Sequence, residues 1–214
     1  MRTFLRLLAV TLLLAGLAAG QAQSQPRPGK DFFELTPARP VSTGQAIEVL
    51  EFFYYGCPIC YEAQPHIARW LLKAGGDVEL RRVPAISSEG WDSFARTYYA
   101  LDGMKELQRL HWPVYDNHHF DGRKLNEEKN LLVWVGSNGV DAKRFSEIWH
   151  SPDTDAKIKS AQRMLETYSV RGVPTFVIDG KYQTSARMAG GTRQMMEVVD
   201  NLVARARRDR ALKK

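Results

Sequence analysis

Cysteine is scarce in this chain of 214 residues, which contains only Cys57 and Cys60. Two cysteines cannot form the set of disulfides that holds small secreted scaffolds together, so that class is excluded. Long apolar runs are also missing: Leu7–Ala19 has thirteen residues, short of the about 20 that span a bilayer. A hydrophobic content of 44% excludes extensive disorder, and a net charge of +6 does not by itself indicate nucleic-acid binding.

The N-terminus has the pattern of a secretory signal. Arg2 and Arg6 precede the apolar run Leu7–Ala19, and small residues follow it. We expect residues 1–22 to be removed as a signal peptide, with cleavage after Ala22 or two residues earlier. The alternative, a retained membrane anchor, is disfavoured because the run is too short. Export would place the mature chain in an oxidising compartment, where disulfides persist.

The segment around the two cysteines predicts a strand, a helix and a second strand. Ile47–Tyr55 is almost entirely apolar and rich in β-branched and aromatic residues, which is typical of a buried central strand. Pro58 suits the first position of a helix, and a Gly-Gly pair at Gly75 ends that helix. Val78–Val83 is the next strand, so the unit is expected to be parallel.

The rest of the chain continues with helices before it returns to strands. Ala85–Arg171 has the spacing of several amphipathic helices and no convincing strand pattern. Thr175–Ile178 and Lys181–Thr184, joined by an Asp-Gly turn, predict a β-hairpin. Thr192–Ala206 predicts a final helix. The predicted fold class is therefore α/β, with a long helical insertion between a β-α-β start and a β-β-α end.

The spacing of the two cysteines indicates redox chemistry. A helix start presents unpaired N–H groups and the positive end of the helix dipole, which stabilise a thiolate on the first cysteine. We therefore predict that Cys57 is the exposed nucleophile and that Cys60 is the resolving cysteine. The pair would cycle between dithiol and disulfide through a mixed disulfide, with no other cofactor.

Two alternative roles for the cysteines remain open at this point. A purely structural disulfide would close so short a loop that it would stabilise the fold little. A zinc site needs two more ligands, and the nearby His66 lies too far round the same helix to converge easily. We predict no metal site. The other histidines, which we interpret as ordinary surface or core residues, are His111, His118, His119 and His150.

Three segments of the chain together resemble a known family. They are Glu51–Tyr61 around the cysteines, Arg171–Thr175 with its Gly-Val-Pro sequence, and Asp179–Tyr182. The first resembles the active-site strand and helix of the DsbA thiol:disulfide oxidoreductases, the second their cis-proline loop, and the third the hairpin that follows it. The long helical segment between them resembles the helical insertion of that family. The resemblance implies a thioredoxin-like fold with an inserted all-helical domain.

The resemblance also implies a domain organisation. Residues 44–88 and 165–214 would form the thioredoxin-like domain, and residues 89–164 would form the inserted helical domain. Residues 23–43 would be a flexible lead-in and N-terminal segment, because Gln, Pro, Ser and Gly are frequent at its beginning.

The resemblance assigns roles to residues outside the two cysteines. Pro174 would have a cis peptide bond facing Cys57, and the backbone of Val173 would then be free to pair with an extended substrate. An ordinary trans proline is the alternative. Glu51 would be the buried acid beneath the active site that relays the proton of Cys60. Its alternative is a glutamate on an edge strand that reaches water.

Two positions depart from the common family pattern. Ile59 stands where relatives usually have a histidine, and isoleucine can give neither charge nor a hydrogen bond to the thiolate of Cys57. The resemblance then predicts a higher pKa for Cys57 than a histidine would give, and a less oxidising disulfide. Gln64 replaces an acid that relatives often have. Pro58 and Ile59 are expected, with Val173, to contact the substrate.

These inferences predict a periplasmic thiol:disulfide oxidoreductase that introduces disulfide bonds into reduced secreted proteins through Cys57 and Cys60. The resemblance implies reoxidation by a membrane quinone reductase of the DsbB type, a monomeric state and no nucleic-acid partner. One alternative is a weaker oxidant that works as a reductase or isomerase, which Ile59 favours. Another is a redox-silent binding or chaperone protein, against which the two intact cysteines argue. The basic segment Ala204–Lys214 is interpreted as solvated.

Overall fold

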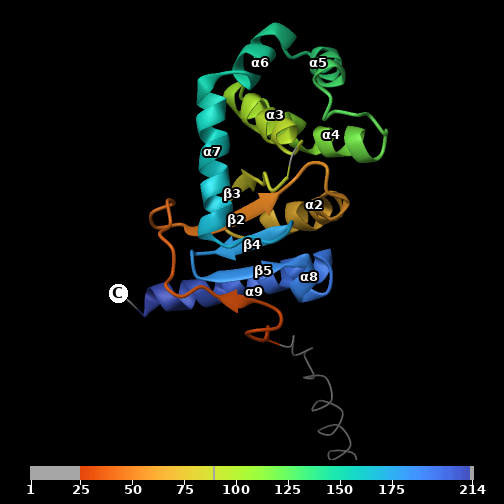
Figure 1. The fold of residues 1–214 in the computed structure, drawn as a ribbon. Helices are drawn as coiled ribbons and strands as arrows, with labels where there is room; N and C mark the ends of the chain where they lie inside the picture. The colour runs from red at the N-terminus through yellow and green to blue at the C-terminus, as the bar shows by residue number, and fades with distance from the viewer. Residues whose placement is uncertain (1–24, 89, 213–214) are drawn as a thin grey trace, which may run out of the picture.

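The computed structural model describes residues 25–88 and 90–212 (Figure 1). The predicted signal peptide, residues 1–22, lies outside the described residues. Within the described ranges, no helix has both the length and the apolar character needed to cross a membrane.

A five-stranded mixed sheet forms the centre of the fold. Its order is β1-β5-β4-β2-β3, in which β2 pairs in parallel with β3 and antiparallel with β4. All seven residues of β2 are buried, which confirms the predicted central strand. The strands are β1 (Phe33–Glu34), β2 (Ile47–Phe53), β3 (Val78–Pro84), β4 (Thr175–Ile178) and β5 (Tyr182–Ser185).

The helices form two groups, one around the sheet and one beside it (Figure 1). One face of the sheet packs against α2 (Pro58–Leu71) and α9 (Thr192–Ala211), with the short α8 (Ala186–Ala189) at the start of α9. The helices of the insertion surround a second core, which they share with Phe53 at the end of β2 and with Cys60. These helices are α3 (Asp92–Gly103), α4 (Leu107–His119), α5 (Glu128–Ser137) and α6 (Ala142–Trp149). The thioredoxin-like fold with a helical insertion is therefore confirmed.

The helix α7 (Pro152–Thr167) connects the insertion back to the sheet. Ser151 caps its N-terminus by accepting the backbone N–H of Thr154, and proline takes the first helical position. Near its other end, Ala161 and Leu165 pack with residues of β2 on the face opposite α2. The predicted domain boundary at residue 165 therefore falls inside a continuous helix that belongs to both parts.

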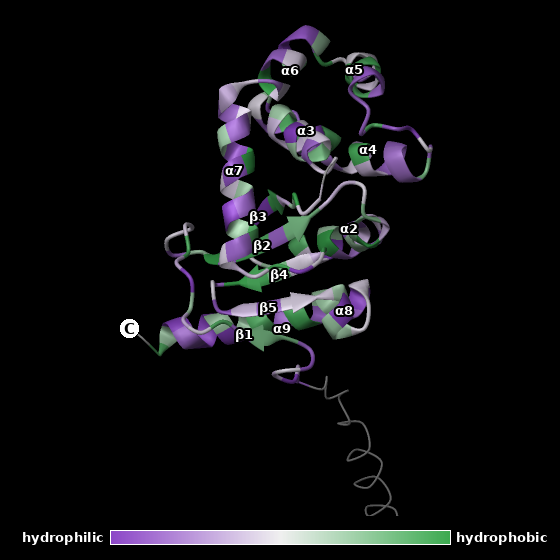
Figure 2. Cartoon of the chain, viewed as in Figure 1, coloured by the Kyte–Doolittle hydropathy of each residue, from purple (hydrophilic) through white to green (hydrophobic). Residues whose placement is uncertain are grey.

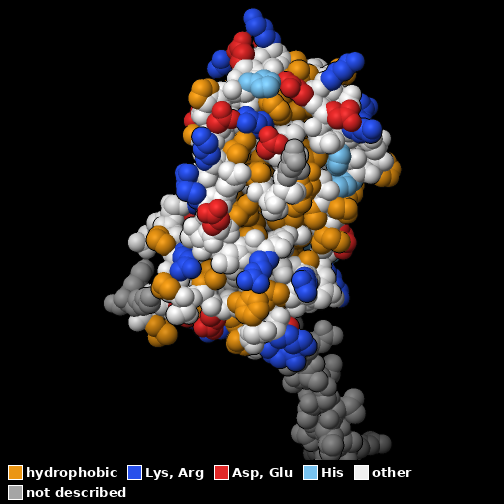
Figure 3. Space-filling model, in the orientation of Figure 1, with side chains coloured by type: hydrophobic (Ala, Val, Ile, Leu, Met, Phe, Trp, Pro, Cys, Tyr) orange, Lys and Arg blue, Asp and Glu red, His pale blue; other side chains and the backbone are white. Residues whose placement is uncertain are grey.

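The surface pattern agrees with this arrangement. Figure 2 shows hydrophilic and hydrophobic residues alternating around α7 and α9, as expected for helices with one buried face. On the face drawn in Figure 3, charges of both signs are interspersed over the helical part, with hydrophobic side chains between them.

The N-terminal segment before β2 contributes a short strand to the sheet. Phe32 is 1% exposed and packs edge-on against Tyr182, and the two-residue β1 pairs with β5. A strand of two residues has no periodicity, so the sequence pattern could not reveal it. The N-terminal segment that follows the predicted lead-in is therefore attached to the sheet from Phe32 onward.

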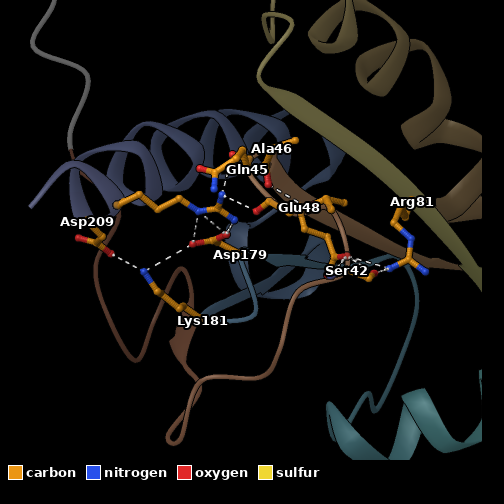
Figure 4. Close-up of polar contacts among 11 residues, drawn as sticks. Ser42, Gln45, Ala46, Glu48, Arg81, Asp179, Lys181 and Asp209 are labelled. Atoms are coloured by element: carbon orange, nitrogen blue, oxygen red, sulfur yellow. Dashed lines mark hydrogen bonds and ion pairs between the residues drawn. The ribbon is translucent and has the colours of Figure 1, made fainter. Parts of the chain in front are cut away.

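Buried ion pairs fix the end of the sheet that lies away from the cysteines. Asp179, after β4, pairs with Arg210 and Lys181, and Glu48 of β2 pairs with Arg81 (Figure 4). Three arginines of the basic C-terminal segment make ion pairs; Arg205 and Arg207 stay more than a third exposed, as the solvated interpretation expects, whereas Arg210 pairs with a buried carboxylate. Their ion pairs are Arg205–Glu34, Arg207–Asp77 and Arg210–Asp179.

Candidate active site

Cys57 lies at the N-terminus of α2, directly after the loop that follows β2. It is the N-cap residue, and its Sγ accepts the backbone N–H of Cys60 at 3.4 Å. Pro58 occupies the first turn, where the missing N–H costs no helical hydrogen bond. Cys57 is partly exposed, Cys60 is buried, and both are free thiols. Pro58 and Ile59 are exposed between them.

The two thiols have very different acidities. A hydrogen bond from the Cys60 thiol, together with the backbone N–H groups of Cys60 and Ile59, lowers the pKa of Cys57 to about 6, although burial opposes this shift. Burial, followed by the hydrogen bond to Cys57, raises the pKa of Cys60 well above its ordinary value. Near neutral pH, Cys57 is therefore mainly a thiolate and Cys60 a thiol. This division exists without an imidazole at position 59.

The acidity of Cys57 predicts a pH-dependent stability of the reduced protein. An unfolded cysteine has a pKa near 9.0, so between about pH 6 and 9 the unfolded chain binds a proton that the folded chain has lost. Reduced protein should gain stability as pH rises through this window and lose it as pH falls toward 6. The raised pKa of Cys60 acts only above the window. Urea unfolding of reduced and oxidised protein over this range measures the difference, and parallel curves would contradict the prediction.

The proline loop meets the cysteines across 116 residues of sequence. The Val173–Pro174 peptide bond is cis, as the resemblance implied. The carbonyl oxygen of Val173 lies 3.7 Å from Sγ of Cys57, and the hydroxyl of Thr175 donates to the carbonyl of Gly172 at 2.7 Å. Val173 is half-buried, and its backbone carbonyl lies beside the thiol.

Glu51 lies beneath the cysteines on the face of β2 that carries α2. Its side chain has no exposure, and its strand lies between β4 and β3, so the alternative of an edge glutamate that reaches water does not hold. Arg82 donates Nε–H to one carboxylate oxygen at 2.9 Å. Gln64 donates to the other at 3.1 Å and to the carbonyl of Cys60 at 3.3 Å. The carboxylate is thus neutralised and connected to the α2 backbone beside Cys60.

Sequence reasoning missed Arg82. It is the register partner of Glu51 in the parallel pair β2 and β3. A cleft of about 770 Å³ between α2 and α4 reaches both Arg82 and Gln64. A glutamate in the apolar strand β2 and two adjacent arginines in β3 were a usable signal for this pair, but the register was needed to match Glu51 with Arg82.

An aromatic stack explains the glycine before Cys57. The rings of Tyr54 and Trp91 stack with centroids 3.9 Å apart and an interplanar angle of 3°. A Cβ atom on Gly56 would lie 2.5 Å from the nearest ring atom of Tyr54, which is closer than real Cβ contacts. Gly56 therefore lets the ring lie flat against the loop that carries Cys57.

Two histidines of α4 also reach this loop. Nδ1 of His111 lies 2.7 Å from the hydroxyl of Tyr55, and Nε2 of His119 lies 2.7 Å from the carbonyl oxygen of Tyr55. His111 is a buried core histidine, as interpreted, but the sequence did not indicate that both side chains bind the residue beside the active-site loop. Their spacing of eight residues places them on one helix face, but it acquires meaning only once α4 is known to pack beside this loop.

Comparison with known proteins agrees with the geometry. Residues 71–203 match the family described as DSBA-like thioredoxin domain. The thiol:disulfide interchange protein DsbA of Pseudomonas syringae pv. tomato is 33% identical over 198 residues, which cover 92% of each chain. The DsbA of Burkholderia cepacia is 32% identical over 92% of this chain and 95% of its own. The crystal structure of Pseudomonas aeruginosa DsbA superposes with a TM-score of 0.79 and 32% identity, covering 87% of this chain and 96% of that one.

Proposed function

Because this chain belongs to the DSBA-like thioredoxin domain family and is a thiol:disulfide oxidoreductase, we propose that it acts in the periplasm as an oxidant of secreted proteins. The observation that carries this direction is the contrast between the two thiols, with a pKa of about 6 for Cys57 and a raised pKa for Cys60. A stabilised thiolate favours the reduced state of the pair, so the disulfide passes readily to other dithiols.

The exchange proceeds in two balanced steps. A client thiolate attacks Sγ of Cys57 in the Cys57–Cys60 disulfide, which forms a mixed disulfide and releases Cys60 as a thiolate that takes a proton. The second client thiolate then attacks the client sulfur of the mixed disulfide and releases Cys57 as a thiolate. Two electrons pass from the client dithiol to the enzyme. The low pKa of Cys57 makes it a good leaving group in the second step.

Glu51 is proposed to exchange the proton of Cys60. Cys60 is buried, so the thiolate released in the first step needs a proton route through the protein. The Glu51 carboxylate lies in the same buried region, linked to the Cys60 backbone by Gln64. Arg82 and Gln64 both line the cleft beside α2, which brings solvent close to this group.

Equilibration with glutathione tests the direction of transfer. An oxidant should become reduced at low ratios of reduced to oxidised glutathione, because the Cys57 thiolate stabilises the dithiol form. A protein that keeps its disulfide at high concentrations of reduced glutathione would instead support the reductase alternative. Mass mapping of alkylated thiols at each ratio gives the equilibrium constant.

Replacement of Ile59 tests what the missing imidazole does. Ile59 is 44% exposed at the start of α2, next to the Cys57 thiolate. We expect Ile59→His to lower the pKa of Cys57 and to make the disulfide more oxidising, because the imidazole adds a favourable contact to the thiolate. A shift of one pKa unit corresponds to about 1.4 kcal/mol. Thiolate absorbance against pH measures the shift, with Ile59→Leu as control. An unchanged pKa in Ile59→His would contradict the argument.

Replacement of Pro174 tests the proposed docking of clients at the loop. Val173 and Pro174 lie beside the thiol, where the loop backbone can pair with an extended client. We expect Pro174→Thr to slow the release of mixed disulfides several-fold while the fold persists. Non-reducing electrophoresis of the protein mixed with a reduced client follows the release, and far-UV circular dichroism checks the fold. Turnover equal to that of the original protein would count against docking at this loop.

Reoxidation is proposed to occur at a membrane quinone reductase of the DsbB type, and the chain is proposed to act as a monomer. The signal-like N-terminus and the family membership support the proposed reoxidation partner. Reduced protein added to quinone-containing bacterial membranes should regain its disulfide with uptake of oxygen. Protein that stays reduced under these conditions would exclude this partner.

A further inference from the structure

Tyr55 connects the sheet to the active-site helix. It lies two residues before Cys57, between the end of β2 and the start of α2, and its side chain is 1% exposed. Both ends of the residue are bound by α4, a helix of the insertion. His111 contacts the hydroxyl and His119 contacts the carbonyl oxygen, each at 2.7 Å. The insertion therefore holds this loop at two points, two helical turns apart.

His119 is the donor in its contact. A carbonyl oxygen can only accept a hydrogen bond, so Nε2 of His119 carries the proton that bridges to Tyr55. The imidazole also stacks on Tyr61, with centroids 5.0 Å apart and an interplanar angle of 14°. The backbone N–H of Tyr61 donates to the carbonyl of Cys57 at 3.0 Å. His119 thus contacts residues on both sides of the reactive cysteine.

His111 holds the other end of Tyr55 by a contact between two neutral groups. Burial lowers the pKa of His111 well below its ordinary value, and burial raises the pKa of Tyr55 well above its own. This hydrogen bond holds the Tyr55 ring in place, because breaking it would leave two buried polar groups with neither a partner nor water.

We propose that His119 is a positioning residue for disulfide exchange, which together with His111 fixes Tyr55 and thereby holds Cys57 at the N-terminus of α2. This inference rests on the exchange proposed above. Without the His119 bond, the loop can move, and the N–H groups of Ile59 and Cys60 no longer point steadily at Sγ of Cys57. The thiolate then loses part of its stabilisation.

Three variants test the proposal, with thiolate absorbance against pH and glutathione equilibration as readouts. His119→Leu removes the donor, and His119→Gln keeps an N–H that can reach the carbonyl. His150→Leu is the control, because His150 ends α6 and contacts Glu128. We expect His119→Leu to raise the pKa of Cys57 by about half a unit, the value of one modest hydrogen bond. The glutathione equilibrium at pH 7 should then shift about two- to threefold. His119→Gln and His150→Leu should keep the Cys57 pKa and the glutathione equilibrium of the original protein.

The outcomes distinguish a failure of the His119 positioning role from a failure of the proposed function. An unchanged pKa in His119→Leu, or an equal shift in His119→Gln, would overturn the positioning role. If His119→Leu does not fold, His119→Met removes the donor with a more flexible side chain and carries the same expectation. Absence of any thiolate transition near pH 6 in the original protein would instead contradict the proposed function. Thermal unfolding of each variant reports any general loss of stability.

Discussion

Cys57→Ser is expected to abolish disulfide transfer, whereas Cys60→Ser is expected to accumulate mixed disulfides with clients. Only Cys57 is partly exposed and carries a thiolate near neutral pH, with a pKa of about 6. Serine at position 57 has no sulfur to form the mixed disulfide. With serine at position 60, the Cys57 thiolate can still attack a client disulfide, but no second thiol in the protein can release it.

Alkylation of the reduced protein measures the assignment directly. A short exposure to iodoacetamide at neutral pH should label Cys57 first, because the thiolate is the reactive form and Cys60 is buried and protonated. Peptide mass mapping identifies the labelled cysteine. The double variant Cys57→Ser/Cys60→Ser is the control for labelling and for client binding without exchange. Preferential labelling of Cys60 would reverse the two roles.

Local signals explain why the sequence could predict the cysteine site. The apolar run that became β2, the proline at the first position of α2 and the spacing of the two cysteines all act within fourteen residues. Each signal depends on backbone geometry that neighbours in sequence determine. The hairpin of β4 and β5 was predicted for the same reason, since an Asp-Gly turn fixes it.

The residues that the sequence could not reveal act through tertiary contacts. Arg82 meets Glu51 only because β2 and β3 pair in a particular register. His111 and His119 meet Tyr55 only because α4 of the insertion packs beside the active-site loop. No spacing in the sequence encodes such contacts, because the partners are 31 to 64 residues apart. The strand β1 was missed for a different reason, namely its two-residue length.

Arg82→Leu is expected to destabilise the protein by about 3–5 kcal/mol, the range for a buried ion pair that loses one partner. The side chain of Glu51 has no exposure, so without Arg82 its charge would have only the hydrogen bond from Gln64. Removal of the acidic partner should cost less stability. Glu51→Gln leaves an arginine that is 22% exposed and lines the cleft, where its charge can reach water.

The double variant Glu51→Leu/Arg82→Leu separates stability from proton transfer. Removing both charges should restore most of the stability, since two apolar side chains need no compensation in this environment. Exchange should nevertheless be slower than in the original protein, because the Cys60 thiolate would have no nearby carboxylate to pass it a proton from the water in the cleft. Urea unfolding gives the stabilities, and stopped-flow reaction with a reduced client gives the rate of the first step. If the double variant exchanged as fast as the original protein, Glu51 would have only a structural role. If Arg82→Leu lost less than about 1 kcal/mol, the ion pair would not be what keeps the Glu51 charge inside the fold.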